Sequence, residues 1–202
     1  CGGWGRVSFH FAKKGFHVTI LDLIPEYLAQ AKETFNKSGL EVLTVCADCR
    51  ETPKDIQADY ATVFFNTVGF FNDIQQVRAF RSLYQALKPG AKVLLDCMNL
   101  FFLADKLNPE YDTPRSDGFI FRQNNRFDFN TNTLHSIFQI INPGGKVENE
   151  KFFQQRLFTP LDLKQLLEKA GFTVSNMYSG YNLLPVAFDQ PKLIVVAEKL
   201  GK

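Results

Sequence analysis

Strand-like and helix-like segments alternate along most of this 202-residue chain, and this alternation constrains the fold more than any other feature. The runs 60–65 and 91–97 are almost continuously apolar, which is typical of strands buried on both faces of a sheet. Between them, 73–87 has the pattern of a helix that ends before Lys88-Pro89-Gly90. Strands joined by helices of about 10 to 15 residues require right-handed crossovers and a parallel sheet. The sequence therefore predicts a doubly wound α/β fold.

Similar patterns predict the remaining regular elements. Pro25 begins a helix that ends at Ser38-Gly39, in the usual arrangement of an N-terminal proline and a C-terminal glycine. The other expected helices cover 6–14 and 160–170, and the other expected strands cover 17–21, 41–45, 173–178 and 192–198.

The pattern of apolar and polar residues changes between Asn99 and Phe158. Apolar residues alternate with polar ones in short stretches from 119 to 140, and the turn residues Asn124-Asn125 and 142–145 interrupt them. We therefore expect a single domain, 1–202, in which 99–158 is an antiparallel β insertion.

Composition excludes several classes of function. The 23 Lys and Arg residues against 21 Asp and Glu give a net charge of +2, and the basic residues are scattered, so nucleic acid is not an expected partner. No apolar run approaches the roughly 20 residues that cross a bilayer, and no signal segment opens the chain, so a membrane location is not expected. The cysteine spacing is unlike a secreted disulfide framework, which favours the cytoplasm and reduced thiols.

Polar residues follow the expected strands at four places, where ligands bind in open α/β sheets. The first is the glycine-rich turn at 1–5, and the second is Asp22, 17 positions beyond Gly5, at a spacing suited to ribose hydroxyls. The others are Asp48 and Asn66-Thr67. Each also has a plain structural explanation, as a tight turn or as a cap of the following segment.

Together these segments resemble the class I S-adenosylmethionine-dependent methyltransferases, particularly their small-molecule members, over nearly the whole chain. The resemblance is carried by Gly3-Trp4-Gly5-Arg6 with Asp22, Ala47-Asp48-Cys49-Arg50, Phe65-Asn66-Thr67-Val68-Gly69-Phe70-Phe71, Leu87-Lys88-Pro89-Gly90 and Ala170-Gly171-Phe172. It implies a Rossmann-like fold with an antiparallel last strand.

The resemblance also implies S-adenosylmethionine as cofactor and S-adenosylhomocysteine as product. Asp22 would then bind the ribose hydroxyls. The other implied contacts are Cys1, Gly3 and Gly5 with the methionine and ribose, Asp48 and Cys49 with the adenine, Asn66 with the methionyl end, and Leu23 and Thr67 beside them.

The beginning of the chain departs from the family pattern. The first glycine of the motif is Cys1 here, and the family's central strand would precede it. We therefore expect an N-terminal extension in the natural protein, without which the strands on either side would keep unpaired backbone groups.

By the same resemblance, the insertion 99–158 would be a lid that selects the methyl acceptor. The aromatic residues Phe70, Phe71, Tyr178 and Tyr181 are candidates for contact with the acceptor, because aromatic rings gain from contact with a sulfonium. Arg122, Arg126 and Arg156 are further candidates within the insertion. The alternatives are a packed sheet whose arginines face solvent and a core position for Phe70-Phe71.

The predicted function is transfer of a methyl group to nitrogen or oxygen of a small molecule. This in-line displacement depends mainly on positioning, and no catalytic base is predicted. No metal is expected, since Cys46 and Cys49 are only half of a zinc site. Two alternatives stay open: a non-catalytic, cofactor-binding regulatory module, and an NAD-dependent oxidoreductase, because the glycine turn and Asp22 also suit a dinucleotide.

Overall fold

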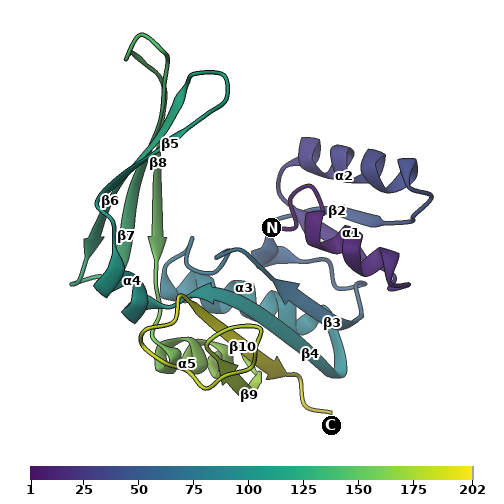
Figure 1. The fold of residues 1–202 in the computed structure, drawn as a ribbon. Coiled ribbons are helices and arrows are strands. Elements are labelled where there is room, and N and C mark those ends of the chain that lie inside the picture. The colour runs from purple at the N-terminus through teal and green to yellow at the C-terminus, as the bar shows by residue number, and fades with distance from the viewer. Residues whose placement is uncertain (202) are drawn as a thin grey trace.

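The computed structural model describes residues 1–201 and contains three sheets (Figure 1). The helices are α1 (Arg6–Lys13), α2 (Pro25–Lys37), α3 (Asp73–Gln85), α4 (Leu100–Lys106) and α5 (Pro160–Ala170), with a short 3₁₀ turn η1 (Cys49–Glu51). The strands are β1 (Thr19–Asp22), β2 (Leu43–Cys46), β3 (Ala58–Val63), β4 (Leu87–Met98), β5 (Glu110–Pro114), β6 (Ile120–Asp128), β7 (Thr133–Ile141), β8 (Val147–Arg156), β9 (Thr173–Tyr178) and β10 (Lys192–Glu198).

The strand order confirms the predicted α/β class and its antiparallel last strand. One sheet has the order β3-β4-β10-β9, in which β3 and β4 are parallel and β10 runs antiparallel to both of its neighbours. The parallel pair β1-β2 forms a separate sheet, and no ladder within residues 1–201 joins β1 to β3. Beside β1, the terminal ammonium of Cys1 and the backbone amide of Gly2 both donate to the carbonyl oxygen of Leu21, each at 2.8 Å.

Two apolar clusters hold these sheets to their helices. Helices α3 and α5 cover one face of the four-stranded sheet, where Leu87, Leu95 and Leu163 are fully buried. Helices α1 and α2 pack instead on β1, around Ile20 and Phe35. Each such side chain removed from water contributes roughly 1.5–3 kcal/mol, so the apolar periodicity that predicts the elements also assembles them.

Three expectations about individual strands are wrong. Asn124-Asn125 does not interrupt a strand, because both residues pair with β7 inside β6. Strand β3 is only partly buried, at Ala61 and Val63, and Tyr60 is 66% exposed, because α1 and α2 pack on β1 rather than on β3. Strand β4 begins at Leu87 and not at Ala91, because a shift in its register with β3 accommodates the Lys88-Pro89-Gly90 segment.

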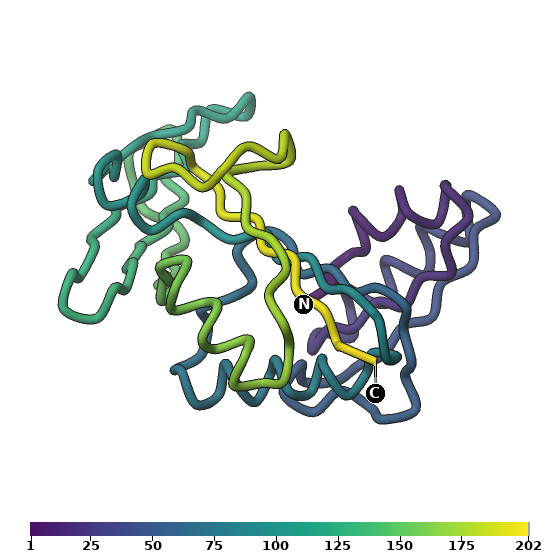
Figure 2. Tube along the Cα trace, turned by 90° about the horizontal axis from the view of Figure 1, so that it is seen from below, coloured from purple at the N-terminus to yellow at the C-terminus, as the bar shows by residue number. Residues whose placement is uncertain are grey.

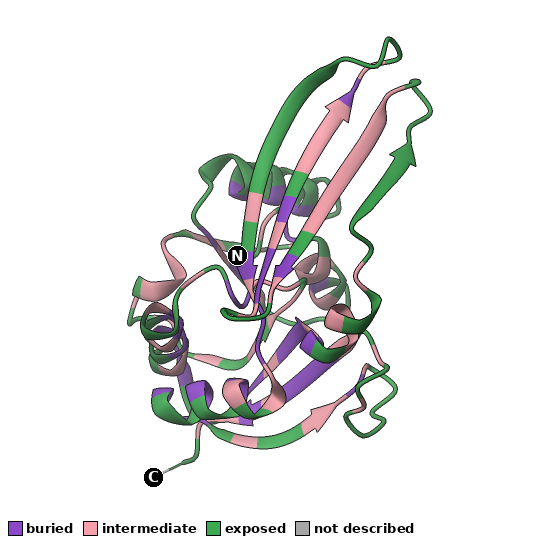
Figure 3. Cartoon of the chain, turned by 90° about the vertical axis from the view of Figure 1, so that its left-hand side faces the viewer, coloured by how far each residue is buried: buried purple, intermediate pink, exposed green. Residues whose placement is uncertain are grey.

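The segment between α4 and α5 forms a four-stranded antiparallel sheet, β5-β6-β7-β8, which projects from the rest of the molecule (Figure 1). Most of its buried residues lie where the sheet meets the domain (Figure 3). There Phe127 and Leu134 pack against Leu100 of α4. Helix α4 is not predicted in the sequence analysis, although Leu100, Leu103, Ala104 and Leu107 have helical spacing.

The β5–β8 sheet and the α1–α2 unit lie at opposite ends of the molecule (Figures 1 and 2). The strand ends of β1, β3 and β4 lie between them. Among the described residues, the helices are too short or too polar to span a membrane.

Candidate functional site

A cavity of about 400 Å³ opens at the glycine turn. It is lined by the turn itself, the first turn of α1, Tyr27 of α2 and the carboxyl end of β3 with the residues that follow it. Trp4 meets Tyr27 edge-on, with 5.6 Å between ring centroids, and the Arg6 guanidinium lies 4.5 Å from the centre of the Phe65 ring. The cavity is therefore at the sheet edge where open α/β folds bind ligands.

Glycines bring the turn close to β1. A Cβ atom at Gly2 would overlap the Ile20 side chain, and one at Gly5 would lie 2.5 Å from Ile20 Cδ1. Gly5 also has a φ of 71°, which L side chains rarely adopt. A larger residue at Gly2 or Gly5 would displace Ile20 from its core cluster, so these glycines have a packing role as well as leaving room for a ligand.

Asp22 joins the turn to the end of β1. Its Oδ2 accepts from the Gly3 amide at 2.8 Å and its Oδ1 from the Ile24 amide at 3.0 Å, and the residue is 7% exposed. A carboxylate oxygen can accept two hydrogen bonds, so each oxygen keeps one free site after these contacts. The Cys1 ammonium also lies 3.8 Å from Oδ2. The carboxylate is thus fixed beside the turn, next to the cavity but not among the residues that line it.

Asp48 is engaged within the protein. Arg50 donates to both carboxylate oxygens of Asp48 through its side chain and to Oδ1 through its backbone amide. These hydrogen bonds lower the pKa of Asp48 to about 2. The neighbouring Cys49 is partly buried, and desolvation raises the pKa of its thiol. Neither residue lines the cavity at the glycine turn.

Replacing Arg50 with methionine is expected to return the pKa of Asp48 towards its ordinary value of 3.8. Because the native pKa lies below the unfolded one, the pair stabilises the protein above about pH 4, and this contribution is lost as the pH falls through about 2. Urea unfolding should show a stability difference of about 1 kcal/mol at pH 7 that narrows towards pH 2. A difference that is independent of pH would contradict this assignment.

The residues after β3 form a strained turn that lines the cavity. Phe65 and Asn66 have φ values of 57° and 56°. Asparagine tolerates this region, but for phenylalanine it costs about 1–3 kcal/mol and requires support from the surroundings. The Asn66 amide donates to the Asp96 carbonyl at 3.3 Å, and Thr67 Oγ1 donates to the Phe64 carbonyl at 2.8 Å.

Strand β8 contacts the same turn. The Gln155 side chain is 2% exposed, and its amide nitrogen donates to the carbonyls of Asn66 and Val68, the latter at 2.8 Å. The Arg156 amide donates to the Gly69 carbonyl at 2.9 Å. The root of the β5–β8 sheet is therefore fastened to the loop that lines the cavity.

The structure separates the candidate acceptor residues into two groups. Phe70 meets Phe153 of β8 edge-on at 5.6 Å, next to the strained turn. Tyr181 lies with its ring 6.5 Å from that of Phe64, which lines the cavity. Phe71 lies under the Arg50 guanidinium, at 4.6 Å from its ring centre.

The remaining candidates have partners elsewhere. Arg122 donates to both oxygens of Asp112 within the β5–β8 sheet, at 2.7 and 2.8 Å. Arg156 pairs with Asp73 at the start of α3, at 2.7 Å. Tyr178 pairs with Ile194 between β9 and β10. The structure does not bring these three to the cavity.

A buried carboxylate that is absent from the sequence predictions holds Tyr181. Asp96 is 2% exposed and accepts from the Tyr181 hydroxyl at 2.7 Å and from the Lys192 ammonium at 2.8 Å. Desolvation, together with the hydrogen bond to Asp96, raises the pKa of Tyr181, so its hydroxyl stays protonated at neutral pH. The sequence does contain a signal for this site, because Asp96 is a charged residue inside the otherwise apolar run 91–97.

Sequence reasoning also missed Trp4, Tyr27 and Gln155. Trp4 stands out as the one large side chain in a glycine turn, and that signal was available. No local pattern distinguishes Tyr27 or Gln155, since their positions follow from tertiary contacts.

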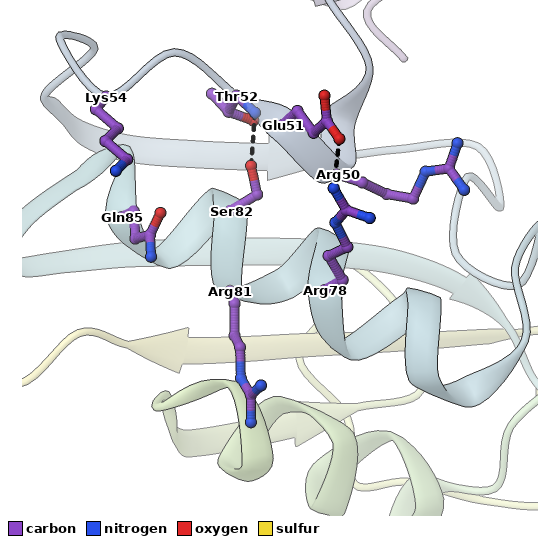
Figure 4. Close-up of a pocket in the computed structure, with 8 residues that line it drawn as sticks. All are labelled: Arg50, Glu51, Thr52, Lys54, Arg78, Arg81, Ser82 and Gln85. Carbon is purple, nitrogen blue, oxygen red and sulfur yellow. Dashed lines mark hydrogen bonds and ion pairs between the residues drawn. The ribbon is translucent and has the colours of Figure 1, made fainter.

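A second cavity, of about 410 Å³, lies between η1 and α3 (Figure 4). Several arginines line it, but their side chains diverge. Arg78 pairs with Glu51, Arg50 points away from the others, and Arg81 extends towards α5, where it donates to the Lys169 carbonyl at 3.1 Å. The three arginine side chains contact other groups of the protein and do not converge on one point.

Comparisons with known proteins agree with this geometry. The methyltransferase domain family matches residues 1–90. The chain is 24% identical to YqeM of Bacillus subtilis (strain 168), a protein named as a putative methyltransferase. The alignment covers 98% of this chain and 81% of YqeM.

Two solved structures share the fold. The CcbJ methyltransferase of Streptomyces caelestis superposes with a TM-score of 0.86 at 18% identity, over 98% of this chain and 86% of that one. The CalS10 methyltransferase of Micromonospora echinaspora, solved with S-adenosylmethionine bound, has a TM-score of 0.73 at 18% identity, over 98% of this chain and 80% of that one. Residues 1–90 thus match a methyltransferase domain family, and the chain has the fold of these solved methyltransferases.

Proposed function

We propose that this protein transfers the methyl group of S-adenosylmethionine to a nitrogen or oxygen atom of a small molecule, and that the β5–β8 sheet is the lid that selects the acceptor. One observation carries the proposal, and it concerns the segment 64–70. Some of its side chains line the cavity at the glycine turn, and its backbone carbonyls accept hydrogen bonds from β8. The same loop thus adjoins a cofactor cavity and the root of the insertion.

The residues present fit the cofactor. The glycine turn leaves space beside β1, and the Asp22 carboxylate keeps a free acceptor site on each oxygen for the two ribose hydroxyls. Cys1, Gly3 and Thr67 line the cavity and would contact the cofactor. Asn66 follows Phe65 in the strained turn and would meet the methionyl end. Asp48 and Cys49 would meet the adenine, and Leu23, directly after Asp22, would lie beside the cofactor.

S-adenosylmethionine supplies an electrophilic methyl group on a sulfonium. The contribution of this chain is to hold the acceptor atom in line and to exclude water. Two aromatic side chains would lie on the acceptor side: Phe70, at the end of the segment 64–70, and Tyr181, whose ring is 6.5 Å from that of Phe64 and whose hydroxyl is held by Asp96. No catalytic base is assigned.

The acceptor is a small polar molecule in this proposal. CalS10 is described as an amino pentose methyltransferase, which supports an amine or hydroxyl of a small polyfunctional molecule as the class to test first. Arg122 and Arg156 are bound to carboxylates, so the proposal does not rely on an anionic acceptor.

Calorimetric titration of the chain with S-adenosylmethionine, S-adenosylhomocysteine and NAD should give micromolar binding of the two sulfur compounds and no binding of NAD. Methyl-labelled S-adenosylmethionine should then transfer label to one class in a panel of amino sugars, amines and alcohols. Binding without transfer to any class would favour the non-catalytic module, and binding of NAD alone would favour the oxidoreductase.

A further inference from the structure

The strained turn after β3 is held by hydrogen bonds to both backbone groups of Asn66. The Asn66 amide donates to the Asp96 carbonyl of β4, and the Asn66 carbonyl accepts from the Gln155 side chain of β8. These bonds join the turn to two strands that lie about 30 and 90 residues further along the chain. Asn66 is therefore held between the central sheet and the insertion.

Gln155 donates two hydrogen bonds from one side-chain nitrogen, which few other side chains can do. A primary amide nitrogen has two hydrogens, and here they go to the carbonyls of Asn66 and Val68. If the amide were replaced by an apolar group, the Val68 carbonyl would be left without a partner in a buried place and the Asn66 carbonyl in a half-buried one. No other side chain among the described residues donates to either carbonyl.

The turn needs this support because of Phe65. Its left-handed backbone is unfavourable for a phenylalanine, so it persists only when neighbouring peptide groups are held in place. In this conformation the Phe65 ring lines the cavity and lies against Arg6. A relaxed turn would move the ring and change the shape of the cavity wall.

We infer that Gln155 is a positioning residue for methyl transfer: from the insertion, it holds Phe65 and Asn66 in the conformation that binds the cofactor. Gln155 is not among the residues that line the cavity. The inference rests on the proposed function, because it takes the cavity at the glycine turn as the cofactor site. By thermodynamic reciprocity, cofactor binding must in turn tighten the attachment of β8.

The test compares Gln155→Leu with Ser136→Ala in the full chain. Ser136 is a matched control, because it is fully buried on the same sheet but bonds only to Asn125 within that sheet, at 2.7 Å. Calorimetry with S-adenosylhomocysteine should show about tenfold weaker binding for Gln155→Leu and a change of less than about twofold for Ser136→Ala. Equal weakening by both variants would overturn the inference, since it would indicate a general loss of sheet stability.

A double-mutant cycle with Phe65→Gly tests the mechanism. Glycine adopts the left-handed conformation without strain, so the turn no longer needs support. In the Phe65→Gly background, the effect of Gln155→Leu on S-adenosylhomocysteine binding should shrink from about tenfold to less than about threefold. An undiminished tenfold effect would overturn the positioning role.

Hydrogen exchange separates this inference from the proposed function. In the ligand-free protein, the amides of 64–70 should exchange faster in Gln155→Leu than in Ser136→Ala or the native chain. If the native chain bound no S-adenosylhomocysteine, the proposed function would fail. Faster exchange in Gln155→Leu would then still show that Gln155 holds the turn in place. Unchanged exchange in Gln155→Leu would overturn the inference by itself.

Discussion

Replacing Gly69 with alanine is expected to destabilise the protein by roughly 3 to 5 kcal/mol. Gly69 has a φ of 107°, and a Cβ atom there would overlap the carbonyl oxygen of Arg156 in β8. Relief of that overlap must move β8 away from the loop, which breaks the bond from the Arg156 amide and strains those from Gln155. Thermal unfolding should show a loss of roughly 10 °C in Tm.

Gly90→Ala provides the matched control. Gly90 also has a positive φ, of 82°, but its Cβ would meet nothing within 4 Å. This variant therefore isolates the backbone strain, which should cost about 1 kcal/mol. Similar losses for the two variants would show that β8 adjusts freely at the loop, and the tight attachment of the insertion would then be wrong.

The fold was predictable because its determinants are local. Apolar periodicity places α1, α2, α3 and α5, and the glycines and prolines at their ends mark where they begin and end. The errors occur where tertiary packing decides. Tyr60 belongs to a run that has the pattern of a buried strand, but the helices that would cover its face pack on β1. Lys88-Pro89-Gly90 ends a helix by pattern, yet it lies inside β4.

The candidate site was only partly predictable. Gly3 and Asp22 are recognisable from spacing, and the structure joins them by a hydrogen bond of 2.8 Å. Gln155 gives no signal in the sequence, because its role depends on a carbonyl that is 89 residues away. The arginines show the converse error: Arg122 and Arg156 have a suggestive charge, but each is already paired with a carboxylate.

Replacing Asp22 with alanine is expected to weaken binding of S-adenosylmethionine by roughly 1–3 kcal/mol, or about 5- to 150-fold. The variant removes the two remaining acceptor sites for the ribose hydroxyls and also frees the Gly3 amide, which shapes the turn. Asparagine should not restore binding, because both oxygens of Asp22 face backbone donors and an amide nitrogen would oppose one of them. Calorimetry with both variants measures the effect.

Two comparisons identify the ribose as the cause. Asp59→Ala removes the same charge from β3, where Asp59 forms an exposed pair with Lys88, and should leave cofactor affinity unchanged. The native chain should bind S-adenosylhomocysteine more tightly than its 2′-deoxy analogue, and Asp22→Ala should bind the two with nearly equal affinity, since it has lost the partner of the hydroxyl. If Asp22→Ala kept the full discrimination, the carboxylate would serve the turn alone and the ribose would lie elsewhere in the cavity.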